Sequence, residues 1–376
     1  MSPVTVDPAH PAPAVHPLDP ATAEELEEAV ALVSTKFNDE PLFFHAGGLA
    51  EPPKPILRKY LRAERSGQLI APPPRRMSLM FYIAKPPRLF EATVDVTNKN
   101  VDEFTELPRT KMAPLNPEEV NTICDLVYNS DELKKEAERL NIPLSHIVAE
   151  PWDFARDAEN EHDRKAQVFF FMRDLESEDL DANPYAYPLD FLMIIDLNTD
   201  QDKISSVPRL PLGVSTKGDD EPKDGFKFGK PKAPEYAHHL QKEKARTSLK
   251  PLRVVQPEGP SFSVDGYLIE WEKWRFRIGF NWREGLVLYD ITFDGREVFH
   301  RISLSEMVVP YGEPRAPLHR KNAFDLGNLG AGFCANNLGL GCDCLGVIKY
   351  FDANLLGFNG KPFKTENVVC MHEIDA

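Results

Sequence analysis

The sequence has no apolar run long enough to cross a bilayer, and its amino terminus lacks the basic segment and apolar core of a secretory signal. Its 5 cysteines are too few for the disulfide scaffold of a small secreted protein, so an intracellular location, cytoplasmic or peroxisomal, is expected. Basic residues are outnumbered, with 44 Lys and Arg against 59 Asp and Glu, which gives a net charge of −15. Nucleic-acid phosphates require a basic surface, so we expect no nucleic-acid partner, and without a membrane-spanning run we expect no membrane partner. The negative charge mildly favours a cationic small substrate.

The segment PLDPATAEEL at residues 17 to 26 is repeated as PLNPEEVNTI at residues 114 to 123. In each copy an Asp or Asn can cap a helix, and the next residue, Pro, suits the first helical position, where no N–H is needed. These pairs are Asp19 with Pro20 and Asn116 with Pro117. An apolar stripe at helical spacing follows each start and is predicted to be core: Leu26, Ala29, Val30, Val33 and Phe37 in the first copy, and Val120, Ile123, Cys124 and Val127 in the second.

Strand-like runs follow each predicted helix, at residues 77–84 and 89–96 in the first copy and 168–172 and 191–197 in the second. We therefore predict a duplicated α+β module, with one helix packed on an antiparallel sheet in each copy. The expected divisions are a mobile head (1–15), a first α+β domain (16–105), a second α+β domain (106–212), a charged linker or strap (213–250) and a β-rich region (251–376). Adjacent His238 and His239 in the linker would point to opposite sides of an extended chain, so a solvated loop is expected there and not a metal site.

The region from residue 251 onward is expected to be antiparallel β-sheet. In the run WRFRIGFN at residues 274 to 281, Phe276, Ile278 and Phe280 alternate with Arg275, Arg277 and Gly279, which is the pattern of a half-exposed strand. Asp294-Gly295 stands between two further strand-like runs and is a strong hairpin signal. Since no long helix is evident, we predict a β-sandwich here and an α+β fold class for the chain.

The run LGCDCLG at residues 340 to 346 places Cys342 and Cys344 one residue apart. Together with Cys370 and His372 they could form a zinc site, although these spacings are tighter than those of the usual zinc knuckle. A redox pair within Cys-x-Cys would need a strained ring, and two unrelated thiols are a third possibility.

Asp325 is a candidate general base because it stands between Phe324 and the Gly-rich turn LGNLG, with Tyr311 upstream. Apolar surroundings destabilise an ionised carboxylate and raise its pKa toward the range useful for proton transfer. The alternative from the pattern alone is an Asp that caps the Gly-rich turn.

Six segments of the chain closely resemble the copper- and topaquinone-dependent amine oxidases. They are QPEGPSFSVDG (256–266), WEKWRFRIGFNWREGLVLYDI (271–291), SLSEMVVPYGEP (303–314), RKNAFDLGNLGAG (320–332), LGLGCDCLGVIKYFDA (338–353) and VVCMHEIDA (368–376). The resemblance extends over nearly the whole chain. It implies two small cystatin-like α+β domains followed by a β-sandwich catalytic domain, of which this chain would hold an incomplete amino-terminal part.

The resemblance also implies roles for individual residues. Asp325 would be the catalytic proton acceptor, and the hydroxyl of Tyr311 would hold a ring oxygen of the cofactor. Ala323 and Phe324 would line the substrate channel, with the small Ala323 at a position where some members carry an aromatic gate. Cys344 and Cys370 would form a disulfide, which would leave the cysteines Cys124, Cys334 and Cys342 unpaired.

The cofactors of the family are copper, bound by a His-x-His pair and a third His, and topaquinone, made from the Tyr of an Asn-Tyr-Asp/Glu motif. The 376 residues contain no His-x-His pair and no Asn-Tyr dipeptide. We therefore expect a primary amine oxidase by family, acting on a primary amine and O₂ as a homodimer, whose 376-residue chain cannot form either cofactor and is inactive alone. The rival hypothesis is an inactive truncated form that serves as an interaction or regulatory module.

Overall fold

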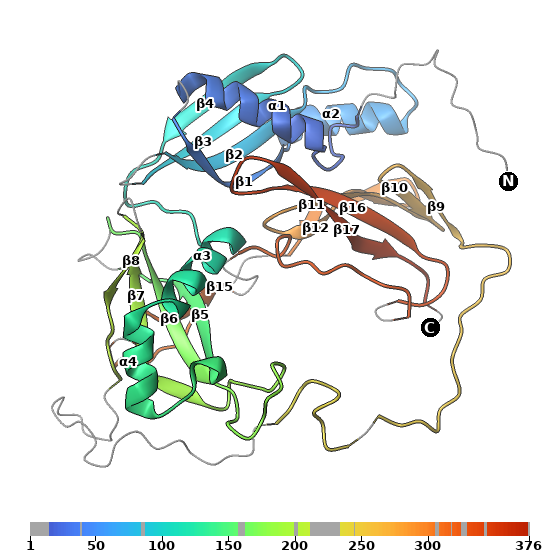
Figure 1. The fold of residues 1–376 in the computed structure, drawn as a ribbon. Coiled ribbons are helices and arrows are strands. Elements are labelled where there is room, and N and C mark those ends of the chain that lie inside the picture. The colour runs from blue at the N-terminus through green and yellow to red at the C-terminus, as the bar shows by residue number, and fades with distance from the viewer. Residues whose placement is uncertain are drawn as a thin grey trace, which may run out of the picture.

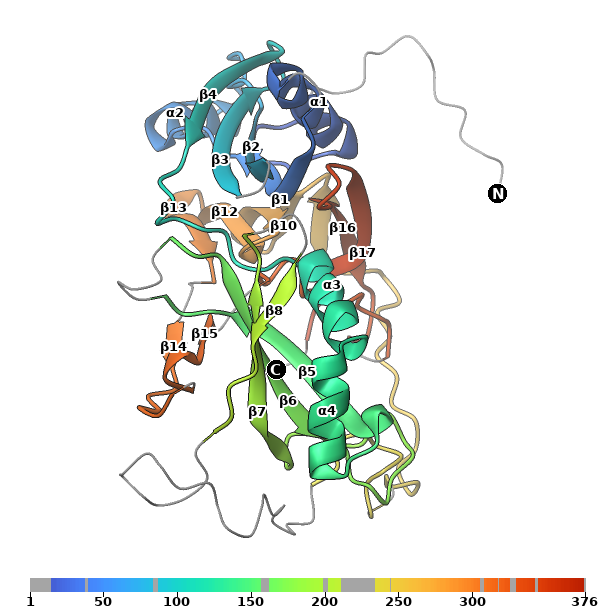
Figure 2. The same ribbon diagram turned by 60° about the vertical axis from the view of Figure 1, so that its left-hand side comes forward.

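A computed structural model describes residues 15–374 apart from 38–39, 84–86, 157–161, 199–201, 211–233, 244, 305–307, 317, 325–328 and 342–343. The fold is mixed α and β, with several antiparallel sheets (Figure 1; Figure 2). This confirms the predicted combination of helices with antiparallel strands, while the exact domain division remains a proposal. The predicted mobile head, except for Val15, lies outside the described residues.

The first sheet has four strands in the order β1-β2-β3-β4. Their bounds are β1 (Leu42–Ala50), β2 (Arg76–Ile83), β3 (Arg88–Asp95) and β4 (Asn100–Glu106). Helix α1 (Ala23–Ser34), continued by a 3-10 turn η1 (Thr35–Phe37), packs on this sheet, while α2 (Lys54–Arg65) connects β1 to β2. The predicted stripe residues Leu26, Ala29 and Val33 are buried in this core.

The start of α1 differs from the sequence prediction. Its N-cap is Thr22, whose hydroxyl accepts from the Glu25 backbone N–H while the Glu25 carboxylate accepts from the Thr22 N–H. Asp19 instead accepts a hydrogen bond from the backbone N–H of His16. A complete capping box satisfies two backbone donors at once, so it determines the helix start in preference to Asp19-Pro20.

The second sheet also has four strands in sequence order, β5-β6-β7-β8. They are β5 (Ile147–Asp153), β6 (Lys165–Met172), β7 (Pro188–Asp196) and β8 (Lys203–Ser206). Helix α3 (Pro117–Tyr128) begins as predicted, with Asn116 as its N-cap and Pro117 in its first turn. Its residues Ile123 and Val127 are buried, whereas Cys124 is half-buried.

The expectation of one helix in each copy is wrong, because α2 and α4 (Asp131–Leu140) are additional. A short 3-10 turn, η2 (Leu144–His146), follows α4. Both additional helices are rich in charged residues and bury little: Leu57, Leu61 and Ala63 in α2, and Leu133, Glu136 and Ala137 in α4. Helix α2 buries two leucines and α4 buries one, so the apolar periodicity of each is weak and the helices are hard to recognise from the sequence.

The third part of the chain contains a five-stranded sheet in the order β13-β12-β11-β10-β9. Its strands are β9 (Phe262–Asp265), β10 (Leu268–Trp271), β11 (Trp274–Asn281), β12 (Gly285–Phe293) and β13 (Arg296–Ser303). A two-stranded ribbon, β16 (Lys349–Leu356) with β17 (Pro362–Met371), shares a core with it through Ile269, Ile278, Phe351 and Val369. The predicted hairpin is confirmed, since Asp294 and Gly295 connect β12 to β13 with φ values of 51° and 75°.

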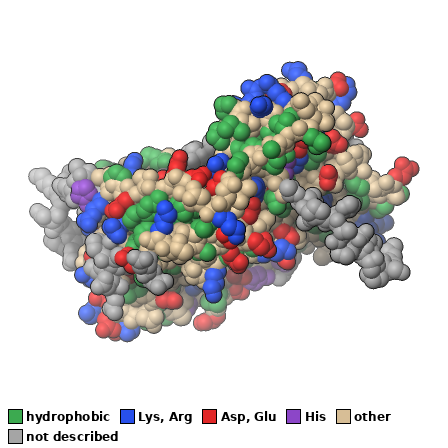
Figure 3. Space-filling model, turned by 90° about the horizontal axis from the view of Figure 1, so that it is seen from above, with side chains coloured by type: hydrophobic (Ala, Val, Ile, Leu, Met, Phe, Trp, Pro, Cys, Tyr) green, Lys and Arg blue, Asp and Glu red, His purple; other side chains and the backbone are tan. Residues whose placement is uncertain are grey.

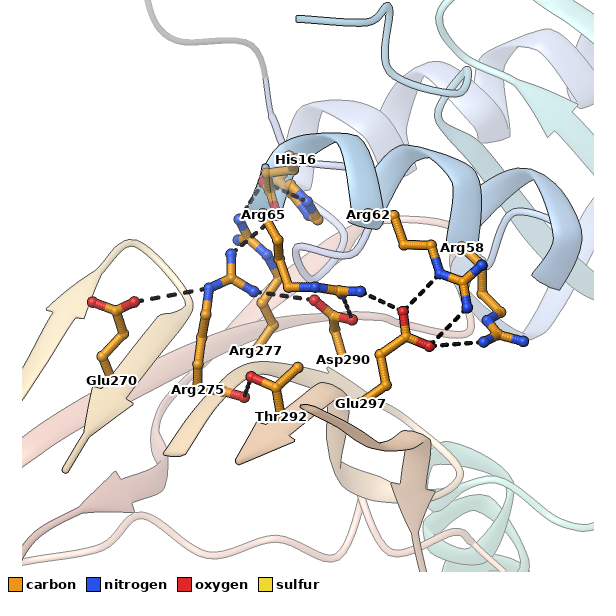
Figure 4. Close-up of polar contacts among 11 residues, drawn as sticks. His16, Arg58, Arg62, Arg65, Glu270, Arg275, Arg277, Asp290, Thr292 and Glu297 are labelled. Atoms are coloured by element: carbon orange, nitrogen blue, oxygen red, sulfur yellow. Dashed lines mark hydrogen bonds and ion pairs between the residues drawn. The ribbon is translucent and has the colours of Figure 1, made fainter. Parts of the chain in front are cut away.

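Strand β11 is not half-exposed as predicted, because α2 covers its outer face (Figure 4). Arg277 is only 8% exposed, and its Nη2 lies 2.8 Å from a carboxylate oxygen of Glu64 on α2. Arg58, Arg62 and Arg65 of the same helix all contact Glu297 of β13 (Figure 4). The alternating arginines of β11 therefore form an ionic interface with a helix and not a solvated face.

The part of the linker that the structure describes contacts the second sheet region. The backbone N–H of Asn183 donates to Glu235, and the ring of His239, half exposed, lies 2.9 Å from Asp179. On the face shown in Figure 3, basic and acidic side chains are interspersed. Across the described residues, no helix has the length and apolar character needed to span a membrane.

Candidate functional site

Two of the predicted site residues, Ala323 and Phe324, lie on a small hairpin formed by β14 (Val308–Pro310) and β15 (Asn322–Phe324), and Tyr311 directly follows β14. Ala323 pairs with Val309, and the ladder continues as the Tyr311 N–H donates to the Lys321 carbonyl at 3.2 Å. Asp325 lies outside the described residues, as does the side chain of Phe324. Because Asp325 directly follows the last residue of β15, the hairpin fixes where its segment begins.

The ring of Tyr311 belongs to an aromatic cage that the sequence did not predict. We use this name for Trp152 of β5, Phe169 of β6 and Tyr311 itself. Trp152 packs edge-on against Tyr311, with centroids 5.7 Å apart, and against Phe169 at 5.3 Å. The Lys321 ammonium nitrogen lies 4.8 Å from the centroids of Trp152 and Phe169 and 4.5 Å from that of Tyr311. Burial lowers the pKa of Lys321, whereas the nearby Glu150 carboxylate raises it.

Arg320 attaches the same hairpin to the second sheet. Residues Leu318–Arg320 form the 3-10 turn η3 just before β15. The Arg320 guanidinium lies 4.7 Å from the ring centroid of Phe154 and donates to the Ala155 carbonyl at 2.9 Å. The fully buried Gln167 of β6 donates its amide to the Arg320 carbonyl at 2.9 Å. Two consecutive cations, Arg320 and Lys321, thus hold the hairpin beside β5.

The chain that follows Asp325 is anchored as well. The backbone N–H groups of Ala331 and Gly332 donate to the carbonyls of Arg283 and Trp282 at 2.9 and 2.8 Å. A Cβ atom at Gly332 would lie 2.1 Å from the Asn281 carbonyl oxygen, and Gly330 has a φ of +95°. Both positions therefore require glycine. The segment that contains Asp325 is consequently held at both ends.

Replacing Gly332 with Ala should destabilise the chain by about 1–3 kcal/mol, because the added methyl group meets backbone atoms that cannot turn aside. Urea unfolding followed by circular dichroism measures the loss. Gly48→Ala is the matched control, since the nearest atom to its Cβ would be Trp282 Cδ1 at 3.9 Å. Equal midpoints for the two variants would contradict the prediction.

A buried polar cluster lies behind the hairpin. Arg164 forms an ion pair with Glu119 at 2.6 Å, and its guanidinium stacks on the Tyr82 ring at 4.5 Å. Burial raises the pKa of Asp153 to about 6 and lowers the pKa of His45 to about 4. A cavity of about 630 Å³ is lined by Asp153 and Arg164 together with Asn322 of β15, among other residues. Asn322 of the hairpin thus faces the same cavity as two members of the buried polar cluster, Asp153 and Arg164.

The sulfur atoms of Cys344 and Cys370 lie 2.9 Å apart, where the resemblance places a disulfide. The ring of His372 is close enough that the three potential ligand atoms lie within 4.8 Å of one another. Cys342 lies outside the described residues, so the four-residue zinc set is untested. The two sulfur atoms are in contact but lie farther apart than the roughly 2.05 Å of a disulfide bond, whose formation stays a prediction. Burial raises the pKa of Cys124 and of Cys334.

Within the described ranges, the other cluster of potential metal ligands consists of Asp179, Asp181 and His239. Neither cluster contains the three histidines that the resemblance implies for copper. The described residues therefore do not fit a copper site of that kind, and we derive no step through copper.

Comparisons with known proteins agree with the resemblance. Residues 263–376 match the model of the copper amine oxidase enzyme domain. Copper amine oxidase 1 of Aspergillus niger is 38% identical over 372 residues, which cover 96% of this chain and 55% of that protein. A peroxisomal primary amine oxidase of Pichia angusta is 34% identical over 93% of this chain and 49% of its own length.

A solved structure gives the same relationship. The crystal structure of a copper-containing benzylamine oxidase from Hansenula polymorpha superimposes with a TM-score of 0.84 at 36% identity, covering 96% of this chain and 56% of that one. The chain spans about half the length of the relatives it matches. By sequence along almost all of its length, and by its fold, this chain is a relative of the copper amine oxidases.

Proposed function

We propose that this chain is the part of a primary amine oxidase that supplies the proton acceptor and the residue that positions the cofactor. The reaction would convert R-CH₂-NH₂, O₂ and water into an aldehyde, ammonia and H₂O₂. The observation that carries the proposal is the relationship to copper amine oxidases over 96% of the chain. The hairpin that carries Tyr311 and Ala323, and that leads directly into Asp325, is consistent with it.

In this proposal the Asp325 carboxylate removes a proton from the carbon beside the amine nitrogen. The Tyr311 hydroxyl holds an oxygen of the cofactor, and the small Ala323 leaves room for the substrate, with Phe324 beside it in the channel. A carboxylate near apolar groups is suited to this step because desolvation raises its pKa toward the working pH.

Copper and topaquinone would supply the electron sink that makes the substrate carbon acidic. The 376 residues contain neither a His-x-His pair nor an Asn-Tyr dipeptide, so we assign no residue of this chain to either group. We propose an intracellular location, in keeping with the peroxisomal relative, and a homodimer, as the resemblance implies.

The 376-residue chain alone, incubated with copper and O₂, is expected to give no adduct with phenylhydrazine, a reagent for quinone carbonyls, and no H₂O₂ with methylamine or benzylamine. Any adduct would show that the chain builds its own cofactor and would contradict this expectation.

A chimera tests the positive part of the proposal. In it this chain replaces the matched part of Aspergillus niger copper amine oxidase 1, and the unaltered relative is the control. We expect the chimera to bind copper, react with phenylhydrazine and release H₂O₂ with a primary amine. A chimera that reacts with phenylhydrazine but releases no H₂O₂ would contradict the proposed function.

A further inference from the structure

We propose that Lys321 is a positioning residue, whose ammonium group, enclosed by the aromatic cage, fixes the ring of Tyr311 and the hairpin that carries it against the second sheet. The proposed function gives Lys321 no role of its own. The contacts of Lys321 do not depend on the proposed function. Only the reason for holding Tyr311 in place rests on that function.

The cage joins separate parts of the fold. Trp152 and Phe169 belong to the neighbouring strands β5 and β6, while Tyr311 and Lys321 belong to the hairpin. Because the ammonium nitrogen lies at almost equal distances from the three ring centroids, one cation interacts with rings of both parts at once. An attraction of this kind depends on the charge and on the distance to the ring faces, so it restricts the ring of Tyr311 as well as Lys321.

Among the described residues, no carboxylate forms an ion pair with the Lys321 ammonium group, and Glu150 acts on it only at longer range. The Glu150 carboxylate is itself bonded to the hydroxyl of Tyr185. The three rings are therefore the main interaction of this half-buried cation.

The hairpin has little else to hold it. Its strands have three residues each, and Val308, Val309 and Tyr311 are exposed. Isolated two-stranded hairpins are marginally stable in water, so their position depends on contacts with the rest of the fold. On the hairpin side these contacts come from Leu318, Arg320, Lys321 and the ring of Tyr311. Of the two cations, only Lys321 lies against Tyr311.

The test uses the 376-residue chain labelled with 3-fluorotyrosine and followed by ¹⁹F NMR, with the Tyr311 signal assigned through Tyr311→Phe. Lys321→Met keeps the length of the side chain and removes its charge, while Lys321→Arg keeps the charge. We expect Lys321→Met to shift the Tyr311 signal toward the value of free 3-fluorotyrosine and to leave the other tyrosine signals in place. Lys321→Arg should restore the original shift.

Lys349→Met is the matched control, because Lys349 lies 5.6 Å from the single ring of Phe351 in a different ribbon. It should leave the Tyr311 signal unchanged. The proposal is overturned if Lys321→Met does not move that signal, if Lys321→Arg behaves like Lys321→Met, or if all tyrosine signals move together, since the effect must be confined to the hairpin.

The chimera adds a second measurement. There Lys321→Met should lower turnover by about 10- to 100-fold through misplacement of Tyr311, and Lys321→Arg should recover most of it. An inactive parent chimera would reject the proposed function and leave the NMR result intact. An active chimera with unchanged turnover in Lys321→Met would reject the positioning role alone.

Discussion

Replacing Asp325 with Asn in the chimera is expected to lower turnover by about 10²- to 10⁴-fold, the usual contribution of a positioned general base. The amide has nearly the same size as the carboxylate but cannot accept the substrate proton at neutral pH. Reaction with phenylhydrazine should persist, because that reaction reports the cofactor and does not need the base. The measurements are H₂O₂ release under saturating amine and the absorbance of the phenylhydrazine adduct.

Two variants separate the loss of the base from a general effect of substitution. Asp294→Asn makes the same chemical change in the exposed turn between β12 and β13, where Asn accepts a positive φ as readily as Asp. It should leave turnover unchanged. Asp325→Glu keeps a carboxylate but moves it, so we expect an intermediate loss. If Asp325→Asn retained at least half of the turnover, Asp325 would not be the proton acceptor.

The parts of the fold that could be predicted are those whose signal lies within a few consecutive residues. The start of α3 at Asn116-Pro117 and the hairpin at Asp294-Gly295 both follow from backbone geometry that the local residues prefer. The predicted start of α1 was wrong because two local signals competed there. The complete capping box at Thr22 determined where the helix begins.

The aromatic cage could not be predicted in this way, because its members come from segments that meet only after folding. Trp152 and Phe169 are diagonal neighbours on adjacent strands, and Lys321 comes to them from a hairpin much later in the chain. The nearest local signal is the pair Arg320-Lys321 just before a short apolar strand. Likewise, the arginines of β11 indicated a solvated face because nothing in their own segment reveals the covering helix α2.

The buried groups His45 and Asp153 should give opposite pH dependences of stability over the same range. The pKa of His45 is lowered by burial from 6.5 to about 4, so as the pH falls through this range the unfolded state takes up a proton that the folded state does not. Its contribution therefore weakens the fold toward pH 4. The pKa of Asp153 is raised by burial from 3.8 to about 6, so there the folded state holds a proton that the unfolded state has lost. Its contribution is fully present below about pH 4 and is lost as the pH rises through 6.

Substitution should reveal each dependence separately. We expect Asp153→Asn to be more stable than the parent chain by up to about 3 kcal/mol at pH 7.5, and the difference to vanish near pH 4, where the carboxyl group is neutral. His45→Phe keeps a ring against Trp282, whose centroid lies 5.5 Å from that of His45. Its stability relative to the parent should rise by up to about 3 kcal/mol as the pH falls from 7.5 to 4, on top of a constant offset from the altered packing.

The measurement is urea unfolding of the parent chain, both single variants and the double variant at half-unit steps between pH 4 and 7.5. Carboxylates whose pKa is lowered, such as Glu64 and Glu284 at about 2, lose their contribution mainly below this range and do so equally in all four proteins. Differences from the parent therefore isolate the two buried groups.

In the parent chain, the two slopes of unfolding free energy against pH have opposite sign and nearly cancel. In the double variant both slopes are absent. Each single variant should thus show the slope of the group that remains. Stability curves that run parallel for all four proteins would mean that neither group titrates differently in the folded and unfolded chain.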